Sequence, residues 1–505
     1  MSFNSPLYIL FLFIVVVLYW VIPQVELQLF LLLIASSLFY SSLFYSSFLS
    51  LYLQWYYIPL FLLITIINWQ LGKSVAFNKR DSKKGTKLRK KIILWLGIIL
   101  NVLLLAGFKY IPFLLGTMSS IYQQFTNTPL VSLQDTTQWV ADSLVVPLGI
   151  SFFTFESIAF LVDSFQGQIV VGSLLQFTTY KLFFPKLISG PITAYDEFYR
   201  QINQKSPPQI HQLIEGVWLI AIGIFKKAMV ADRLGVLVEL CFSNAERAGS
   251  TDLWLGIIAY GFQLYLDFSG YVDMARGSAM LLGFNLPENF DFPYFTTSIA
   301  DFWRKWHMTL GSWLRQYLYF PLGGSRIGLI RTCFNLILVM LIAGIWHGAA
   351  WGFLVWGGLH GIGLAVHRLT DVISKKSPTL QQFWQHPGGI LVAWFLTQAM
   401  VFLTWVFFRL PNLEQSKLVL NHLWGHRRDI QFAQQVYQRT IGLNPTQLFT
   451  LLAILWVCLT INFFVQRHLK LDISWHLKLF MIPLILFIVW LLAPEGGLPY
   501  IYFNF

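Results

Sequence analysis

The stretch from Thr332 to Val366 contains no Lys, Arg, Asp or Glu, and this apolar run limits what the chain can fold into. A straight helix of the roughly 32 residues from Asn335 to Val366 would measure roughly 48 Å, whereas the hydrocarbon core of a membrane is about 30 Å thick. The run must therefore bend, re-enter the membrane or turn. The residues that most readily permit this are Gly344, Gly348 and Gly352.

The composition of the whole chain indicates a membrane protein. Of its 505 residues, 56% are hydrophobic and 11% are charged, and the mean hydropathy is +0.61. Soluble domains are about a quarter charged, so these values exclude a water-soluble globular protein. About eleven to thirteen segments approach the roughly 20 apolar residues that a membrane helix needs. We expect an all-α polytopic membrane protein. Its first segment is predicted to be a retained span, because residues 1–53 contain no Lys or Arg and so lack the basic region of a signal peptide.

The placement of the basic residues predicts the orientation of the chain and argues against nucleic acid as a partner. The net charge is +12, but nine basic residues and one acid crowd the loop Lys73–Lys91, and no Lys or Arg lies between Lys109 and Lys181. Short cytoplasmic loops are the ones that collect Lys and Arg. We therefore expect loop Lys73–Lys91 to be cytoplasmic, facing lipid headgroups, and loop Gly116–Ala141 to lie outside. Three spans before the basic loop then place the N-terminus outside.

Several kinds of catalytic or metal site have no support in the sequence. The cysteines Cys241, Cys333 and Cys458 lie far apart in apolar contexts, without CxxC or zinc spacing, and no metal site is expected. There is no GxSxG and no HExxH, and Gly323-Gly324 is too short to form a phosphate-binding loop. What remains is histidine-assisted transfer onto or from a hydroxyl within a membrane cavity.

Ionisable residues interrupt the apolar region that begins near Val145. Glu156 and Asp163 are seven positions apart, on one helix face, and Asp267 and Asp273 interrupt a later run. Charged groups at membrane depth are costly and usually face a bundle interior or a wet cavity. Two interpretations stay open: such residues face a cavity, or they cap helix ends at the membrane interface.

The stretch 296–324 is too polar to span a membrane. On a helical wheel one face is apolar, whereas Arg304 and Arg315 lie opposite. The residues of the apolar face are Phe302, Trp303, Trp306, Leu310, Trp313, Leu314 and Tyr317. This pattern predicts a helix in the plane of the interface, with Asp301 as its N-cap. His307 falls at the boundary of the two faces. It is either an interfacial anchor of the kind that Tyr and Trp provide or a functional residue.

His347, within the sequence IAGIWHGAAW, lies at or near the expected break in the long apolar run. Irregular backbone at membrane depth needs protein or water around it, so a histidine there is a candidate acid or base. The alternative is a neutral core histidine bonded to a carbonyl group, and His360 fits that alternative better than His347 does.

The chain resembles the membrane-bound O-acyltransferase family, and within it the alginate O-acetylation branch. The motifs that carry the resemblance extend over about residues 145–366, with a further match at the terminus, PYIYFNF. They include GISFFTFESIAFLVDSFQG, YLDFSGYVDMARGSAMLLGFNLPENFDFPY, DFWRKWHMTLGSWLRQYLYFPLGGSR and AGIWHGAAWGFLVWGGLHG. The resemblance implies one integral domain, residues 1–505. It would be a bundle of helices, with interfacial and re-entrant segments, around a tunnel through the membrane.

The resemblance also implies a reaction and the residues that perform it. We expect a multi-pass O-acyltransferase of the bacterial plasma membrane that moves acetyl from cytoplasmic acetyl-CoA, a substrate rather than a bound cofactor, towards an exported polysaccharide. His347 would be the general base and His307 would position the donor or the acceptor. The predicted substrate-binding residues are Trp303, Arg304, Trp306, Trp346 and Asp273, with Arg304 meeting a donor phosphate. The expected partners are membrane lipid and a separate extracytoplasmic acetyltransferase.

Two other functions remain as alternatives. The same fold could transfer D-alanine from a carrier protein to a teichoic acid. From another class, a secondary transporter or polysaccharide export channel would show related halves with paired broken helices. The sequence contains a single WHG-type break and no second copy of it, which argues against the transporter.

Overall fold

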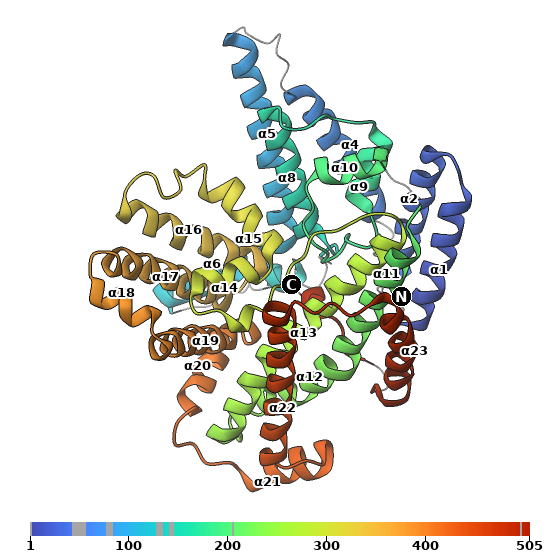
Figure 1. The fold of residues 1–505 in the computed structure, drawn as a ribbon. Coiled ribbons are helices and arrows are strands. Elements are labelled where there is room, and N and C mark those ends of the chain that lie inside the picture. Colours follow the sequence, from blue (N-terminus) through green and yellow to red (C-terminus); the bar gives the residue numbers. More distant parts are fainter. Residues whose placement is uncertain are drawn as a thin grey trace. The chain divides into compact units, whose positions relative to one another are not determined.

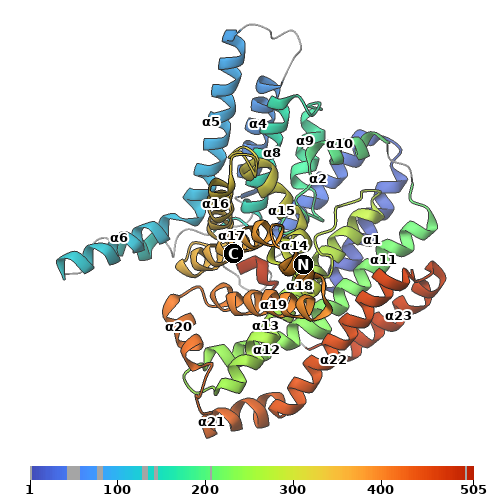
Figure 2. The same ribbon diagram turned by 60° about the vertical axis from the view of Figure 1, so that its left-hand side comes forward.

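The computed structural model describes residues 3–42, 57–76, 84–127, 135–140, 146–204, 207–494 and 497–504. Over these residues the chain is helical, as the ribbon in Figure 1 and its turned view in Figure 2 show. The only strand-like pairing among them is an isolated antiparallel bridge between Phe290 and Trp306. The predicted all-α architecture is confirmed.

The helices divide into two compact units. Unit 1 contains residues 1–220 and 274–287, and unit 2 contains residues 221–273 and 288–505. Two helices, α11 (Ile210–Ile224) and α13 (Ser250–Leu281), contribute residues to both units. The other helices of unit 1 are α1 (Pro6–Val21), α2 (Val25–Ser42), α4 (Tyr57–Val75), α5 (Lys84–Lys109), α6 (Ile111–Thr126), α8 (Ile150–Gln166), α9 (Leu174–Leu182) and α10 (Tyr195–Gln204).

Aromatic packing holds the interior of unit 1 together. The ring of Phe160 on α8 lies 4.2 Å from that of Phe177 on α9 and 5.1 Å from that of Tyr195 on α10, between centroids. Helix α4 approaches at Gly72, where an added Cβ would lie 2.2 Å from the Phe160 ring. Helices α4, α8 and α9 can therefore pack closely only with glycine at this position.

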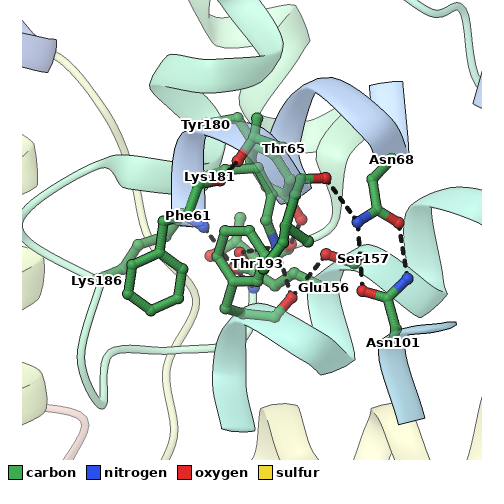
Figure 3. A network of polar contacts seen from close by, with 12 residues as sticks. Phe61, Thr65, Asn68, Asn101, Glu156, Ser157, Tyr180, Lys181, Lys186 and Thr193 are labelled. Atoms are coloured by element: carbon green, nitrogen blue, oxygen red, sulfur yellow. Dashed lines mark hydrogen bonds and ion pairs between the residues drawn. The ribbon is translucent and has the colours of Figure 1, made fainter. Parts of the chain in front are cut away.

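A buried charge network lies inside unit 1 and excludes one of the two interpretations of Glu156, that it caps a helix end at the membrane interface. Figure 3 shows its carboxylate between two ammonium groups: Lys186 Nζ is 2.5 Å from Oε1, and Lys181 Nζ is 3.6 Å from Oε2. All three side chains are at most 6% exposed, and Lys181 also donates to the Phe153 carbonyl at 2.6 Å. Glu156 thus ties α8 to α9 and to the segment after α9, rather than capping a helix end.

Unit 2 contains short helices, π-helical turns and several long apolar helices. Its remaining elements are η1 (Phe225–Ala231), α12 (Asp232–Ser243), η2 (Pro293–Phe295), α14 (Ile299–Lys305), α15 (Met308–Leu314), η3 (Arg315–Tyr319), α16 (Leu329–His347), α17 (Trp351–Ser374), α18 (Pro378–Gln385), α19 (Pro387–Arg409), α20 (Leu413–His422), α21 (Ile430–Ala433), η4 (Gln434–Ile441), α22 (Pro445–Phe464), η5 (Val465–Leu469), α23 (Trp475–Leu492) and η6 (Ile501–Asn504).

The long uncharged run forms a helical hairpin, so the expected break is confirmed. Helix α16 ends at His347 and α17 begins at Trp351, and the two helices lie side by side in both views. Added Cβ atoms would lie 2.3 Å from the Phe353 carbonyl oxygen at Gly344 and 2.4 Å from the Met340 carbonyl oxygen at Gly357. Small residues at such a crossing allow two membrane helices to approach at backbone distance.

Seven described helices are long and apolar enough to cross a membrane, by length and composition. They are α2, α4, α5, α16, α19, α22 with η5, and α23; α1 is apolar but shorter. The sequence suggested eleven to thirteen segments. The difference comes from helices such as α8 and α11, which have 17 and 15 residues. A multi-pass membrane protein is therefore confirmed, with fewer long spans than expected in the part of the chain described.

Two local predictions were wrong. The stretch 296–324 is not one helix, because α14 ends at Lys305 and α15 begins at Met308. The N-cap of α14 is Ser298, whose hydroxyl accepts from the amide of Asp301 at 3.1 Å. Likewise, the predicted outer loop Gly116–Ala141 is helical up to Thr126, within α6. Residues 128–134 and 141, and residues 77–83 of the basic loop, lie outside the described residues.

Candidate functional site

His347 lies at the end of α16, inside a shell of aromatic rings. Its side chain is buried, and the centroid of its ring is 5.0 Å from that of Phe408 and 5.1 Å from that of Trp356. The next residue, Gly348, permits the close approach of Phe353, because an added Cβ would lie 2.1 Å from that ring. The turn that ends α16 therefore holds the imidazole in a fixed and largely apolar environment.

His307 lies between α14 and α15, in a backbone conformation that few residues other than glycine adopt. Its φ is +45°, its side chain is fully buried, and it precedes the first residue of α15. Strained backbone of this kind costs on the order of 1–3 kcal/mol and is found preferentially at functional sites. The interfacial-anchor interpretation is therefore wrong, since an anchor at the boundary would be partly exposed.

Asn289 determines which nitrogen of His307 carries the proton. The side-chain oxygen of Asn289 accepts from the amide of Thr309 at 3.0 Å and from its hydroxyl at 2.7 Å, so this atom must be the amide oxygen. His307 Nδ1 lies 3.4 Å from the same oxygen and is therefore the donor. Nε2 is left as the basic nitrogen. Burial lowers the pKa of His307 to about 3, so the ring is neutral at physiological pH.

The two histidines are brought together by shared aromatic neighbours. The ring of Trp346 lies 6.2 Å from that of His307 and 4.8 Å from that of His347, between centroids. The ring of Tyr502 lies 6.1 Å and 6.0 Å from the same two imidazoles and stacks on Phe268 of α13 at 4.0 Å. The predicted catalytic pair and the predicted substrate-binding Trp346 thus form one buried cluster.

Tyr502 was not predicted as a site residue. The signal that could have indicated it is the terminal motif PYIYFNF, because aromatic side chains so close together need an apolar surface to pack against. The C-terminal segment, residues 497–504, is fixed in place by polar contacts to α13 and η1. The Ile501 amide donates to Asp267 at 3.0 Å, and Lys227 Nζ lies 3.2 Å from the Pro499 carbonyl oxygen.

A π-helical turn, η1, directs two neighbouring lysines at α13. Lys227 lies 2.6 Å from Asp267 and 2.8 Å from Asp232, and all three side chains are buried. Lys226 lies 2.6 Å from Asp273, with both side chains partly exposed. Asp273 therefore has a lysine as its ion-pair partner, five positions beyond Phe268 on α13. Its role in substrate binding stays a prediction.

Trp303 belongs to a hydrogen-bonded chain that orders the neighbouring core. Its Nε1 donates to His360 Nδ1 at 3.2 Å, and His360 Nε2 lies 2.9 Å from the hydroxyl of Thr404. Since the indole can only donate, the proton of His360 is on Nε2 and both of its nitrogens are used. His360 is therefore a structural histidine, and Trp303 is held by it.

The other two predicted substrate-binding residues differ in environment. Trp306 is buried, and its ring lies 5.1 Å from that of Trp405, which in turn lies 5.4 Å from Phe408 beside His347. Arg304 is exposed on the outer face of α14. Trp306 directly precedes His307 and is linked to His347 through the rings of Trp405 and Phe408. Arg304, in contrast, is available to a charged ligand outside the aromatic core.

The two buried imidazoles are suited to proton transfer. In the described part of the chain, no group of three or more His, Cys, Asp or Glu side chains is placed to hold a metal ion. A neutral imidazole can accept a proton from a hydroxyl and return it to a leaving group, as a general base and then a general acid. The surrounding rings exclude water from both imidazoles.

Comparisons with known proteins agree with this chemistry. The profile of MBOAT, the membrane-bound O-acyltransferase family, matches residues 39–408. A peptidoglycan O-acetyltransferase of Helicobacter pylori is 38% identical over 363 residues, 66% of this chain and 65% of that protein. A probable alginate O-acetylase AlgI of Azotobacter vinelandii is 33% identical over 416 residues, 82% and 76% of the two chains. A teichoic acid D-alanyltransferase of Streptococcus thermophilus is 31% identical over 257 residues, 48% and 60% of the two chains.

Proposed function

The chain belongs to the membrane-bound O-acyltransferase family, and we propose that the acyl group it transfers is acetyl, destined for hydroxyls of an exported polysaccharide. The single observation that carries this proposal is the buried cluster in which His307 and His347 share the rings of Trp346 and Tyr502. Similarity to the alginate and peptidoglycan O-acetylating proteins, which cover most of this chain, supports acetyl as the group.

In this proposal His347 performs the proton transfers. Its imidazole takes the proton from the acceptor hydroxyl while that oxygen forms a bond to the acetyl carbon. The carbon–sulfur bond of the thioester then breaks, and the leaving thiolate receives the proton from His347. A positioned acid-base group contributes about 10²- to 10⁴-fold to such a step. Acetyl-CoA, as a thioester at the cytoplasmic face, is the proposed donor.

His307 positions a reactant in this scheme. Its ring is oriented by Asn289 on Nδ1 and lies beside Trp346 and Tyr502, where it can contact a bound donor or acceptor. Holding two reactants in a water-free site contributes more to the rate than acid-base chemistry alone. Trp303, Trp306 and Trp346 wall the site, Arg304 meets a donor phosphate, and Asp273 is retained as a substrate-binding residue.

We place the protein in the bacterial plasma membrane, with its N-terminus outside, and expect a separate extracytoplasmic acetyltransferase as its partner. Seven of the described helices have the length and composition of membrane spans, and the polar segment 411–444 is short. A long polysaccharide therefore needs a second protein that receives the acetyl group or presents the glycan. If the purified chain alone acetylates intact polymer at full rate, no such partner is needed.

One experiment tests the proposed reaction against its main rival. Membranes containing the chain are incubated with acetyl-CoA labelled in the acetyl group, or with a carrier protein loaded with labelled D-alanine. The similarity to a teichoic acid D-alanyltransferase is the observation that favours the rival. We expect label from acetyl-CoA in polysaccharide or in an extracytoplasmic protein, and none from D-alanine. Label only from the carrier protein would replace acetyl by D-alanine, and no label from either would refute the proposal.

A further inference from the structure

A groove of about 500 Å³ lies between α17 and α19, and none of the residues around His307 and His347 line it. Helix α18 and the start of α14 complete its walls, so the whole groove belongs to unit 2. Helices α17, α18 and α19 lie side by side in both views (Figures 1 and 2). The apolar side chains of the lining are Ile299, Val366, Ile390, Ala393, Leu396 and Met400. Three of them, Val366, Ile390 and Leu396, are also exposed, so the groove opens at the apolar surface of α19, a helix that can span a membrane.

The length of the groove matches one leaflet of a membrane. Helices α17 and α19 are antiparallel, because the Gly352 amide donates to the Pro411 carbonyl at 2.9 Å and an added Cβ at Gly363 would lie 2.4 Å from Met400 Cε. The lining residues of α19 extend from Ile390 to Met400, which is about 15 Å of helix. Half of the roughly 30 Å hydrocarbon core is the same distance. The groove is therefore about as deep as an acyl chain of one leaflet reaches.

Most of the polar side chains of the groove lie at one end. Four come from the last turns of α17 and one from α18: His367, Thr370, Asp371, Ser374 and Trp384. None of these five is buried, so a ligand in the groove can reach them. Two further polar residues, Thr297 and Ser298, line the groove beside α14, where Ser298 is the N-cap. An apolar groove with a polar end that carries a tryptophan is typical of a membrane helix surface at the level of the headgroups.

Two cations flank the polar end and are held by one carboxylate. Asp371 Oδ2 lies 3.0 Å from Lys375 Nζ and 3.3 Å from Arg368 Nη1. The side chains of Lys375 and Arg368 are 67% and 39% exposed, so both remain accessible to a ligand. One carboxylate cannot neutralise two cations, and Lys376 follows directly, so this end has a net positive charge. Basic pockets between membrane helices at the cytoplasmic face bind anionic lipid headgroups.

We propose that the groove binds phosphatidylglycerol, an anionic phospholipid of the cytoplasmic leaflet. One acyl chain lies along α19, and Arg368 and Lys375, oriented by Asp371, bind the phosphodiester. A soluble phosphate would use the cations but not the apolar depth of the groove, and a zwitterionic lipid would use the depth but complement the charge less well. The histidines take no part in this site, so the inference goes beyond the proposed reaction and does not depend on it.

Binding of a single lipid is measured by native mass spectrometry on the whole purified protein in detergent. Three probes are titrated: phosphatidylglycerol and phosphatidylcholine with the same palmitoyl and oleoyl chains, and glycerophosphoglycerol, the soluble headgroup without chains. We expect the first phosphatidylglycerol to bind at least about tenfold more tightly than the first phosphatidylcholine. The soluble headgroup should not bind in the same concentration range, because it cannot bury apolar surface.

One pair of variants tests the apolar part of the groove. Ala393→Trp fills the groove beside α19 and should weaken the binding of both lipids at least about tenfold. Ala453→Trp is the matched control, since Ala453 is exposed on α22, does not line the groove and should leave lipid binding unchanged. If Ala393→Trp yields little folded protein, Ala393→Leu takes its place, with a smaller effect in the same direction. Unchanged lipid binding in folded Ala393→Trp, or equal losses at the two positions, would refute the inference.

A second pair tests the charges. Arg368→Gln combined with Lys375→Gln should weaken phosphatidylglycerol binding about thirtyfold and remove the preference over phosphatidylcholine, at about tenfold in Kd or less for each cation. Arg326→Gln combined with Arg331→Gln is the matched control. It removes two exposed cations from the same end of the α16–α17 hairpin, outside the groove, and should keep the preference. A wild-type chain without a preference for phosphatidylglycerol, or equal effects of the two double variants, would contradict the proposal.

Two further outcomes would assign the groove to a different ligand. Binding of glycerophosphoglycerol as tight as that of the whole lipid would make the polar end a site for a free phosphate. Displacement of bound phosphatidylglycerol by acetyl-CoA would make the groove an entrance for the donor. Either result would refute the lipid site and leave the proposed function intact. Acetyl transfer is measured on the same proteins, and a chain that binds phosphatidylglycerol as expected but transfers no acetyl would refute the proposed function and leave the lipid site intact.

Discussion

His307 and His347 lie on different helical segments, yet each imidazole contacts the same two rings, those of Trp346 and Tyr502. One of these rings precedes His347 directly in the sequence, and the other comes from the C-terminal segment. Both histidines are buried. A change at either histidine is therefore expected to affect one common site, and the two can be distinguished only by separate measurements of abundance, donor binding and turnover.

The first prediction concerns His347. His347→Gln keeps most of the side-chain volume between the rings of Phe408 and Trp356. We therefore expect near-normal abundance in the membrane and retained donor binding. Activity should fall at least roughly a hundredfold, the lower end of what an acid-base group contributes. Immunoblots, acetyl-CoA binding and label transfer on the same membranes provide the three readouts. Transfer at near wild-type rate would make His347 a packing residue and would leave His307 as the candidate.

His360→Leu is the matched comparison and carries the opposite expectation. The substitution removes the hydrogen-bond partner of Trp303 Nε1, whereas the Thr404 hydroxyl keeps its bond to the Val401 carbonyl at 2.9 Å. A buried donor left without a partner costs about 1–3 kcal/mol, so the variant should be less abundant and should melt at lower temperature. The activity of each remaining folded molecule should fall much less than in His347→Gln. A stable but inactive His360→Leu would show that His360 belongs to the catalytic site.

The third prediction is a pH dependence of stability that originates at His307. Burial lowers the pKa of this imidazole to about 3 from an ordinary value of 6.5, so the unfolded chain binds a proton that the folded chain does not. The stabilisation is therefore complete above about pH 6.5 and is lost as the pH falls towards 3. Between pH 7.5 and 5.0 the loss is about 2 kcal/mol. Melting temperatures in detergent should fall more for the wild-type chain than for His307→Gln, whereas equal decreases would show that His307 titrates normally.

The break before Gly348 could be predicted from the sequence because it follows from length alone. An uncharged run of that size is too long for a single straight helix across a membrane. The kink at His307 was not predictable in the same way. The helical wheel assumes continuous helix, and a positive φ at a histidine is imposed by tertiary packing, here by the pairing of residues 289–291 with 305–308. The N-cap of α14 is Ser298 and not Asp301. Both Ser and Asp are favoured as N-cap residues, so the local sequence does not show at which of the two residues the helix begins.

Helix α6 was predicted as part of a loop, although its apolar residues follow a helical pattern. Its polar Ser, Thr and Gln residues suggested a loop, but Leu114, Met118, Ile121, Tyr122 and Phe125 recur at helical spacing. These side chains are exposed in the structure, as expected for a helix whose apolar face contacts lipid. In contrast, no local pattern could place Tyr502 against the histidines, because that contact joins segments more than 150 residues apart.

The fourth prediction tests the orientation of the chain. A cysteine-free background is made first by replacing Cys241, Cys333 and Cys458, of which Cys458 is exposed. Ser82→Cys in the basic loop and Thr126→Cys at the end of α6 are then treated on intact cells with a membrane-impermeant thiol reagent. Because short basic loops stay in the cytoplasm, we expect labelling at position 126 and not at position 82. Labelling at position 82 and not at position 126 would show the opposite topology.

The last prediction uses two adjacent lysines to test what holds the C-terminal segment beside the histidines. Lys227→Met leaves the buried carboxylates of Asp232 and Asp267 without their cation, and breaking a buried pair in this way costs about 3–5 kcal/mol. The contact from Lys227 to the Pro499 carbonyl is lost with it, so Tyr500 and Tyr502 should become accessible to chymotrypsin and acetyl transfer should fall. Lys226→Met is the control, since its ion pair with Asp273 is partly exposed and does not touch the terminal segment. We expect cleavage after Tyr500 to be at least tenfold faster in Lys227→Met than in Lys226→Met, on folded protein purified under identical conditions. Equal protection in the two variants would show that the segment is held by the stacking of Tyr502 on Phe268 and not by the lysine.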